Sequence, residues 1–378
     1  MQPFRIDIPQ ATLDDLRDRL ARTRWPDEVE GVGWDYGTNV GYMKELVDYW
    51  QHTYDWRAQE AQLNKLSQWT AEIDGTAIHF IHERGKGPNP TPLILFHGWP
   101  DSICRYLKLI PLLTDPATYG GDPNDSFDVI VPWMWDTSAS PQKPVRKQAL
   151  KQLAERCWRL MTEVLGYQRF AAGGGDGGSP TAQLLAVDHP ESIIGLHLTD
   201  IGFHATRAEH ADLSEAEQQY LAALQMASFQ EGAYAMMLGT KPQTFAYGLN
   251  DSPVAWAALV IEKFRAWSDC DGDVERSYTK DELLTNIMLY WVSGAIDPRG
   301  YREEWVMPSL KPDQQIDAPV GLALPPKDLG PIPPREFAAR NLKNIQRWTI
   351  LPRGGHFVAM EDPAPIAEDI RAFYRNFR

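Results

Sequence analysis

The sequence predicts an α/β fold, with a parallel β-sheet covered by helices on both faces, a helical lid and an N-terminal helical extension. Short runs that are almost continuously apolar alternate with helical stretches, which is typical of strands buried in a parallel sheet. Between about Asp200 and Met307 these strand patterns stop and amphipathic helical patterns take their place. A helical insertion into an α/β core is best interpreted as a lid.

Residues 1–75 are expected to form the helical extension. A first helix begins near Thr12, whose hydroxyl precedes apolar residues at helical spacing, and ends before Pro26. Further helices are predicted over Tyr42 to Trp50 and Ala58 to Trp69. The several tryptophans of this segment are expected to pack against the core, because aromatic side chains mostly serve as buried apolar surface.

Residues 76–203 are expected to form the first part of the core, residues 204–307 the lid, and residues 308–378 the second part of the core. The predicted strands are Ala77 to Glu83, Pro92 to Phe96, Phe127 to Val131, Phe170 to Ala172, Gly195 to Leu198, Gly321 to Ala323 and Trp348 to Leu351. The predicted lid helices are Ser214 to Gln225, Val254 to Trp267 and Asp281 to Trp291, and a last helix covers Pro365 to Phe377.

Composition excludes several classes of function. The net charge of −14 provides no basic surplus that would attract nucleic acid or an anionic membrane. No uncharged apolar run reaches the ~18 residues of a membrane span, and the N-terminus does not have the pattern of a secretion signal. Three widely spaced cysteines, Cys104, Cys157 and Cys270, suggest neither disulfides nor zinc. We expect a soluble, cytoplasmic protein that acts on a small molecule.

The segment from Gly173 to Pro180 carries the main functional motif. It follows a predicted strand, precedes a predicted helix, and has the form G-x-nucleophile-x-G with Asp176 at its centre. In this turn of α/β-hydrolases the central residue is strained, and small neighbours let the backbone fold beneath it. No G-x-S-x-G occurs in the chain, so a serine esterase would lack its nucleophile. A carboxylate at this position attacks saturated carbon and gives an alkyl ester.

Two other interpretations compete for the same segment. Gly173, Gly175 and Gly178 also satisfy G-x-G-x-x-G, and Asp200 lies where a ribose-binding acid would follow in a dinucleotide site. Against this, the dinucleotide motif normally opens the first β-α-β unit, whereas several strands precede it here. The segment could also be a plain glycine-rich turn with a capping aspartate. The remaining motifs favour the hydrolase.

His97-Gly98-Trp99-Pro100 directly follows the predicted strand Pro92 to Phe96, where α/β-hydrolases place the second oxyanion loop. The backbone amides of Trp99 and Gly177 are then the natural pair of oxyanion donors. One such donor typically lowers a barrier by about 3–4 kcal/mol. The alternative is an ordinary turn with a buried histidine.

His356 is the best candidate for the base, because it stands in a glycine-rich turn before the last predicted helix. A histidine can deprotonate water at neutral pH. Its orienting acid should follow the preceding strand, where Asp328 comes after the run ending at Leu324. Glu336 is an alternative, although an acid at a helix start more often caps the helix. We choose Asp328.

Two patterns that imitate metal sites are rejected. Asp269 to Asp273 resembles the start of a calcium loop, but its glycine is misplaced and Lys280 stands where a glutamate should close the loop. His79 and His82 lie in a predicted strand, on which they would face opposite sides. We therefore expect no metal and no organic cofactor.

Taken together, these motifs resemble the epoxide hydrolases of the microsomal type and their bacterial relatives, including those of natural-product pathways such as enediyne biosynthesis. The resemblance runs along essentially the whole chain and includes Glu231-Gly-Ala-Tyr234, Lys241-Pro-Gln-Thr244, Glu262-Lys-Phe264 and Gly300-Tyr-Arg-Glu303. It implies that Tyr234 and Tyr301 are paired lid tyrosines that donate hydrogen bonds to the epoxide oxygen. A detoxifying or biosynthetic role is expected.

The chain departs from the family pattern near the predicted site. Gly177 replaces the usual tryptophan after the nucleophile, Asp101 replaces the usual glycine after His-Gly-Trp-Pro, and Asp328 replaces the more common glutamate. A glycine-rich loop is replaced by the segment that contains Trp133 and Trp135. We expect Gly177 to widen the substrate pocket and the two tryptophans to supply new aromatic walls, which favours a bulky aromatic epoxide.

The resulting hypothesis is an epoxide hydrolase that converts an epoxide and water to a vicinal diol through an ester on Asp176. A haloalkane dehalogenase would share the acid, base and nucleophile but would need halide-binding donors instead of two lid tyrosines. A non-catalytic protein that binds an apolar ligand is the alternative from another class. The sequence leaves open the natural substrate, the carbon and enantiomer preferred, and whether the protein is a homodimer.

Overall fold

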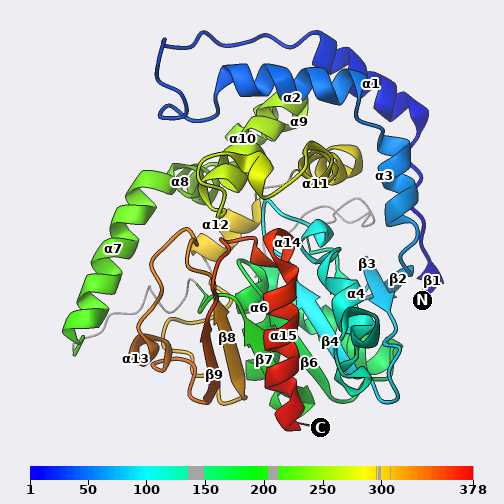
Figure 1. The fold of residues 1–378 in the computed structure, drawn as a ribbon, viewed down its shortest axis with the longest axis vertical. Coiled ribbons are helices and arrows are strands. Elements are labelled where there is room, and N and C mark those ends of the chain that lie inside the picture. The colour runs from blue at the N-terminus through cyan, green and yellow to red at the C-terminus, as the bar shows by residue number, and fades with distance from the viewer. Residues whose placement is uncertain (135–148, 203–211, 295, 297–298, 307, 378) are drawn as a thin grey trace.

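A computed structural model describes residues 1–134, 149–202, 212–294, 296, 299–306 and 308–377 (Figure 1). Within these residues nine strands form one mixed sheet in the order β1-β2-β3-β5-β4-β6-β7-β8-β9. The strands are β1 (Gln2–Pro3), β2 (Gln68–Ile73), β3 (Thr76–Glu83), β4 (Thr91–Phe96), β5 (Phe127–Pro132), β6 (Phe170–Gly174), β7 (Ile193–Leu198), β8 (Val320–Leu324) and β9 (Ile345–Ile350).

The sheet is parallel from β5 to β9 but antiparallel at the edge formed by β1, β2 and β3. The predicted parallel sheet is therefore present from β5 to β9, and the structure adds an antiparallel edge to it. The reason is a tight hairpin between β2 and β3, whose connecting residues Asp74 and Gly75 both have positive φ. Such a short connection can join only antiparallel strands.

The N-terminal segment contributes α1 (Gln10–Ala21), α2 (Val40–His52) and α3 (Trp56–Leu63). The helix predicted to reach Trp69 ends at Leu63, and the side chain of the next residue, Asn64, bonds the amide and carbonyl of Ile6, each at 2.8 Å. The chain then enters β2. Residues 1–75 are predicted to be helical, but the structure shows that they also contain this strand. In Figure 1, α1 and α2 lie across the lid at the end of the molecule away from the sheet.

Helices cover both faces of the sheet, and an apolar core lies on each face. Successive side chains of β4 point to opposite faces and so enter the two cores in turn. Leu93 and Leu95 belong to one core and Ile94 and Phe96 to the other. The first core includes apolar residues of α4 (Leu109–Thr114) and α15 (Pro363–Tyr374), and the second includes residues of α5 (Ala149–Arg159) and α6 (Gly178–Asp188). The predicted α/β arrangement around the central strands is confirmed.

Between β7 and β8 the described residues contain helices and no strand, as the sequence predicts. None of the helices in the described part of the chain is long and apolar enough to span a membrane. Short helices α13 (Arg335–Ala338) and α14 (Val358–Glu361) follow β8 and β9. The helices of the lid are α7 (Glu215–Glu231), α8 (Ala233–Thr240), α9 (Pro242–Asp251), α10 (Pro253–Ala266), α11 (Lys280–Ser293) and α12 (Arg299–Val306).

Candidate active site

Asp176 lies in the tight turn between β6 and α6. Its φ is +55°, a left-handed conformation that a non-glycine residue rarely adopts. The turn leaves no room for a larger residue at Gly178, since a Cβ there would lie 2.0 Å from the carbonyl oxygen of Phe96. The Asp176 amide donates a hydrogen bond to Oδ2 of Asp200 at 2.8 Å. The expected strained elbow is present, and it presents a buried carboxylate.

The loop after β4 closes over this carboxylate. The Trp99 amide donates to Oδ1 of Asp176 at 3.0 Å. A Cβ at Gly98 would lie 2.3 Å from the Cβ of Asp176, so only glycine allows this approach. Gly177, the residue after Asp176, lines a cavity next to this carboxylate. The Trp99 amide, one of the two donors proposed for the oxyanion hole, therefore binds the Asp176 carboxylate. The other proposed donor, the Gly177 amide, belongs to the residue that follows Asp176 in the elbow.

His356, in the loop after β9, lies between two carboxylates. Its Nε2 is 3.3 Å from Oδ2 of Asp176, and its Nδ1 is 2.8 Å from Oδ1 of Asp328. The backbone amide of His356 donates to the carbonyl oxygen of Trp267 at 2.7 Å, which fixes the loop against the lid connection. The structure thus brings together the three residues that the sequence places far apart. Glu336 lies elsewhere, where it accepts from the Ser214 hydroxyl at 3.4 Å.

The charges in this group are strongly coupled. Burial disfavours a charged His356, but Asp328 and Asp176 outweigh that effect and raise the pKa of His356 to about 10. Burial would raise the pKa of Asp328, yet the nearby imidazolium lowers it below its ordinary value. At neutral pH the unreacted site therefore holds a protonated His356 next to the Asp176 carboxylate.

A cavity of about 190 Å³ opens above Asp176, between the core and the lid. Its lining is mostly apolar and aromatic, and two of its walls are tyrosines of the lid helices α8 and α12. The residues around it are Trp99, Leu150, Asp176, Gly177, Pro180, Tyr234, Ala235, Gly300, Tyr301, Glu304, Trp305, Pro308 and Leu310. A cavity of this kind suits an apolar ligand with one polar group near Asp176.

Tyr234 and Tyr301 are held by aromatic neighbours. Their ring centroids are 5.9 Å apart, and Trp99 lies 6.3 Å from Tyr234 and 5.3 Å from Tyr301. Burial, followed by the negative charge of Asp176, raises the pKa of Tyr234. The Lys263 ammonium lies 4.8 Å from the centre of the Tyr234 ring. Burial likewise raises the pKa of Tyr301 well above its ordinary value, so both phenols keep their protons at neutral pH.

The tryptophans expected as pocket walls are placed differently. Trp133 is buried at the end of β5, its amide donates to the carbonyl of His79 at 2.9 Å, and its ring packs against the His79 ring. It is not among the described residues that line the Asp176 cavity. The prediction for Trp133 is wrong on this point. Trp135 lies outside the described residues.

The histidines and aspartates that imitate metal ligands have separate partners. Nε2 of His79 is 2.9 Å from the Gln68 side chain, whereas Nε2 of His82 is 3.2 Å from the Tyr167 hydroxyl. Asp269 accepts from the Gly354 amide at 3.1 Å and therefore supports the turn before His356. Among the described residues no group of three histidine, cysteine or acidic side chains is arranged to hold a metal ion.

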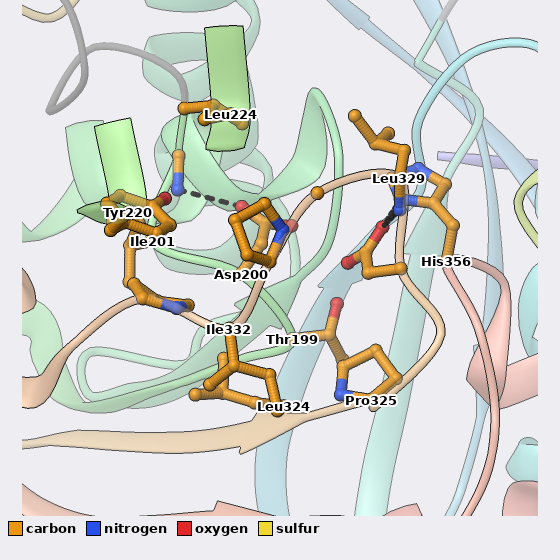
Figure 2. A pocket seen from close by; sticks show the side chains of 15 residues that line it. Thr199, Asp200, Ile201, Tyr220, Leu224, Leu324, Pro325, Leu329, Ile332 and His356 are labelled. Atoms are coloured by element: carbon orange, nitrogen blue, oxygen red, sulfur yellow. Dashed lines mark hydrogen bonds and ion pairs between the residues drawn. The ribbon is translucent and has the colours of Figure 1, made fainter. Parts of the chain in front are cut away.

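Asp200 is a site residue whose role the sequence did not reveal. In the dinucleotide interpretation Asp200 would bind the ribose of the cofactor. In the structure its oxygens accept hydrogen bonds from the Asp176 and Gly202 amides, each at 2.8 Å. Burial and the nearby Asp328 raise its pKa to about 6. Asp200 and His356 line a second, smaller cavity of about 80 Å³. Figure 2 shows the side chains around it. Asp200 therefore holds the backbone of the elbow and does not line the Asp176 cavity.

Comparison with known proteins points to one family. The family model described as "Epoxide hydrolase N terminus" matches residues 1–106. A relative from Stigmatella aurantiaca, also named as an epoxide hydrolase, is 38% identical over 378 residues, which is 100% of this chain and 85% of the relative. "Epoxide hydrolase 1" of Sus scrofa is 33% identical over 99% of this chain and 88% of its own. The structure of an Aspergillus niger epoxide hydrolase superposes with a TM-score of 0.84 at 28% identity, covering 100% of this chain and 96% of that one.

Proposed function

The chain belongs to the epoxide hydrolase family and is an epoxide hydrolase, and on this premise we propose that it forms a covalent alkyl ester on Asp176. One observation carries the proposal. The Asp176 carboxylate is bound by the Trp99 amide on Oδ1 and lies 3.3 Å from the His356 imidazole on Oδ2, at the edge of a cavity that two lid tyrosines complete.

In the first step an oxygen of Asp176 attacks one carbon of the epoxide. Because the Trp99 amide binds Oδ1, that oxygen becomes the ester carbonyl and Oδ2 is the nucleophile. The carbon–oxygen bond of the strained ring breaks, and the released oxygen takes a proton from Tyr234 or Tyr301. The products are a hydroxyalkyl ester and a tyrosinate, which later recovers its proton from solvent.

In the second step water attacks the ester carbonyl and passes a proton to His356, which Asp328 orients through the 2.8 Å bond to Nδ1. The amides of Trp99 and Gly177 bind the oxyanion. When the tetrahedral intermediate collapses, the alkyl oxygen leaves with the proton from His356. The diol is released, and Asp176 keeps one oxygen from water.

The same geometry supports a base that becomes active only after the ester forms. Asp176 and Asp328 together keep His356 protonated in the unreacted site. Esterification removes the negative charge of Asp176 and leaves Asp328 as the main group that raises the pKa of His356. The pKa of His356 then falls, and a neutral imidazole becomes available to accept a proton from water.

We further propose that the substrate is a bulky, aromatic epoxide. The cavity presents aromatic surface from Trp99, Tyr234, Tyr301 and Trp305, and Gly177 leaves space beside the nucleophile. Turnover of aryl epoxides such as styrene oxide should therefore exceed that of small aliphatic epoxides. The variant G177W should lose the large substrates first, because an indole would occupy their space.

The proposal is tested by trapping the ester. H356Q, mixed with styrene oxide, should gain the mass of one epoxide per chain, and peptide mapping should place it on Asp176. The double variant D176A/H356Q is the control and should gain nothing. Diol formation by H356Q at the wild-type rate without any added mass would contradict the covalent route. Halide release from a chloroalkane at a comparable rate would favour the dehalogenase alternative.

A further inference from the structure

We propose that Arg105, held by Asp101, is a positioning residue for His356 and governs the ester-hydrolysis step rather than the ester-forming step. The inference rests on the proposed covalent mechanism. Neither residue lines the Asp176 cavity, and both are at most 1% exposed. A buried arginine–aspartate pair next to an active site is costly to desolvate unless its remaining donors and acceptors are satisfied.

Those donors and acceptors connect three loops of the site. Nη1 of Arg105 pairs with the Asp101 carboxylate, and Nη2 donates to the carbonyl oxygen of His356 at 2.6 Å. Asp101 accepts in turn from the Gly98 amide at 2.7 Å. A Cβ on Gly175 would lie 2.8 Å from Nη2, so the guanidinium also packs under the nucleophile elbow.

The lid fixes the other end of this arrangement. The Tyr290 hydroxyl, on α11, donates to the backbone carbonyl of Asp101 at 2.5 Å. Arg105 itself lies in the short 3-10 helix η1 (Ile103–Tyr106), four residues after Asp101. A planar guanidinium can bind a carboxylate and a carbonyl at once, which a lysine ammonium does with less geometric control. The pair therefore ties the oxyanion loop to the backbone of the base.

Arg105 is also the buried cation among several acids. The charged and titratable groups around the His356 loop include Asp176, Asp200, Asp269, Asp328, Arg105, Tyr278 and Glu361. The charge of Arg105 helps to lower the pKa of Asp328. It also opposes positive charge on His356, so loss of Arg105 should make the imidazole harder to deprotonate.

The two effects act on different steps. Ester formation needs the Asp176 carboxylate and the lid tyrosines, none of which contacts Arg105 through a hydrogen bond in the described structure. Hydrolysis needs a neutral, correctly aimed His356, whose backbone Arg105 holds. A misplacement of about 1 Å can reduce a rate by roughly 10²-fold. Changes at Arg105 should thus slow hydrolysis and leave alkylation nearly intact.

The experiment measures both steps in single-turnover and steady-state reactions with styrene oxide, with acid quenching and mass detection of the ester. R105M should slow hydrolysis by about 10- to 100-fold, accumulate ester during turnover and move the acidic limb of hydrolysis to higher pH. R105K keeps the charge but loses the bond geometry, so its rate should fall without that pH shift.

Two further variants keep the test decisive. D101N/R105M removes both buried charges together, which avoids an unpaired carboxylate and so protects folding. It should still accumulate ester, because the link to His356 is gone. R340M breaks a distant ion pair, in which Arg340 bonds the buried Glu217, and it should leave the ratio of the two steps unchanged.

Equal slowing of alkylation and hydrolysis in R105M and D101N/R105M, with no extra ester, would overturn the proposal and leave the pair a purely structural role. The same assay includes H356Q. If H356Q also fails to accumulate ester while consuming epoxide, the covalent mechanism fails rather than the assignment of Arg105. Ester in H356Q without extra ester in the Arg105 variants rejects the positioning role alone.

Discussion

The core half of the active site is fixed by charged and backbone hydrogen bonds, whereas the lid half is held by aromatic packing. On the core side Asp176 bonds to Trp99 and to Asp200 within 3.0 Å, and His356 bonds to Asp328 at 2.8 Å. On the lid side Tyr234 and Tyr301 contact each other and Trp99 through rings.

The difference follows from what each half must do. In the proposed mechanism the core half stabilises a carboxylate, an imidazolium and an oxyanion, and groups that stabilise developing charge work best when they are already in place. In the same mechanism the lid half surrounds the apolar part of the substrate and offers the hydroxyls of Tyr234 and Tyr301 as donors. Substitutions in the core half should therefore abolish turnover, and substitutions in the lid half should weaken it and alter specificity.

The largest effect is expected for D176A. Without the carboxylate no ester forms, and removal of a covalent nucleophile costs of the order of 10⁶-fold in kcat. Steady-state diol formation from styrene oxide measures it. Circular dichroism serves as a control for folding, because Ala must also adopt the positive φ of this position. Substantial residual turnover would mean that water attacks the epoxide directly.

D328N should follow, with a loss of the order of 10⁴-fold in kcat, since an amide can hold His356 in the wrong tautomer. Ester should accumulate on Asp176 because only hydrolysis needs the base. Quenched-flow mass detection reports both quantities. E336Q is the matched control, since Glu336 lies near Ser214 and away from His356, and this variant should retain full turnover.

Single lid variants should lose less. Y234F and Y301F are each expected to slow ester formation by about 10- to 100-fold, the cost of one hydrogen bond to a developing charge. The double variant should form the ester more slowly than either single variant, because in a single variant the remaining tyrosine can still donate to the epoxide oxygen. If Y234F/Y301F alkylated Asp176 as fast as wild type, the lid half would have no role in opening the ring.

The smallest effect concerns the free energy of unfolding and its dependence on pH. A charged residue of the core half should contribute to this dependence, and an uncharged residue of the lid half should not. The pKa of His356 is raised from 6.5 to about 10, so its protonation stabilises the folded protein fully below pH 6.5, and this contribution is lost as pH rises through about 10. Denaturant titrations should show a decline of the order of 1–3 kcal/mol across this window. H356Q should lack the decline, and Y234F should keep it.

Sequence patterns located the groups that act through local motifs. Asp176 and the Trp99 loop follow buried apolar strands, and His356 follows the edge strand β9. The ends of these parallel strands lie on one side of the sheet, which brings the three together. Asp328 also follows a strand, which is the signal that predicts it as the orienting acid, and in the structure it lies 2.8 Å from Nδ1 of His356. Local sequence motifs are therefore sufficient to predict most residues of the core half of the site.

Groups that act through tertiary contacts could not be found in the same way. Asp200 accepts from the Asp176 amide only because β6 and β7 are neighbours, and Arg105 reaches His356 across 251 residues of chain. The spacing of four between Asp101 and Arg105, in an apolar segment, was an available signal for a buried pair. Trp133 packs against His79, and residue type alone does not say which strand end borders the cavity.

The central claim is that Asp176 is alkylated and then hydrolysed at its carbonyl carbon. The most direct test is one turnover in ¹⁸O-water with enzyme in excess over styrene oxide, followed by mass analysis of the diol and of the peptide that contains Asp176. We predict ¹⁸O in the Asp176 side chain and none in the diol. Heavy oxygen in the first diol, with an unlabelled Asp176, would contradict the account.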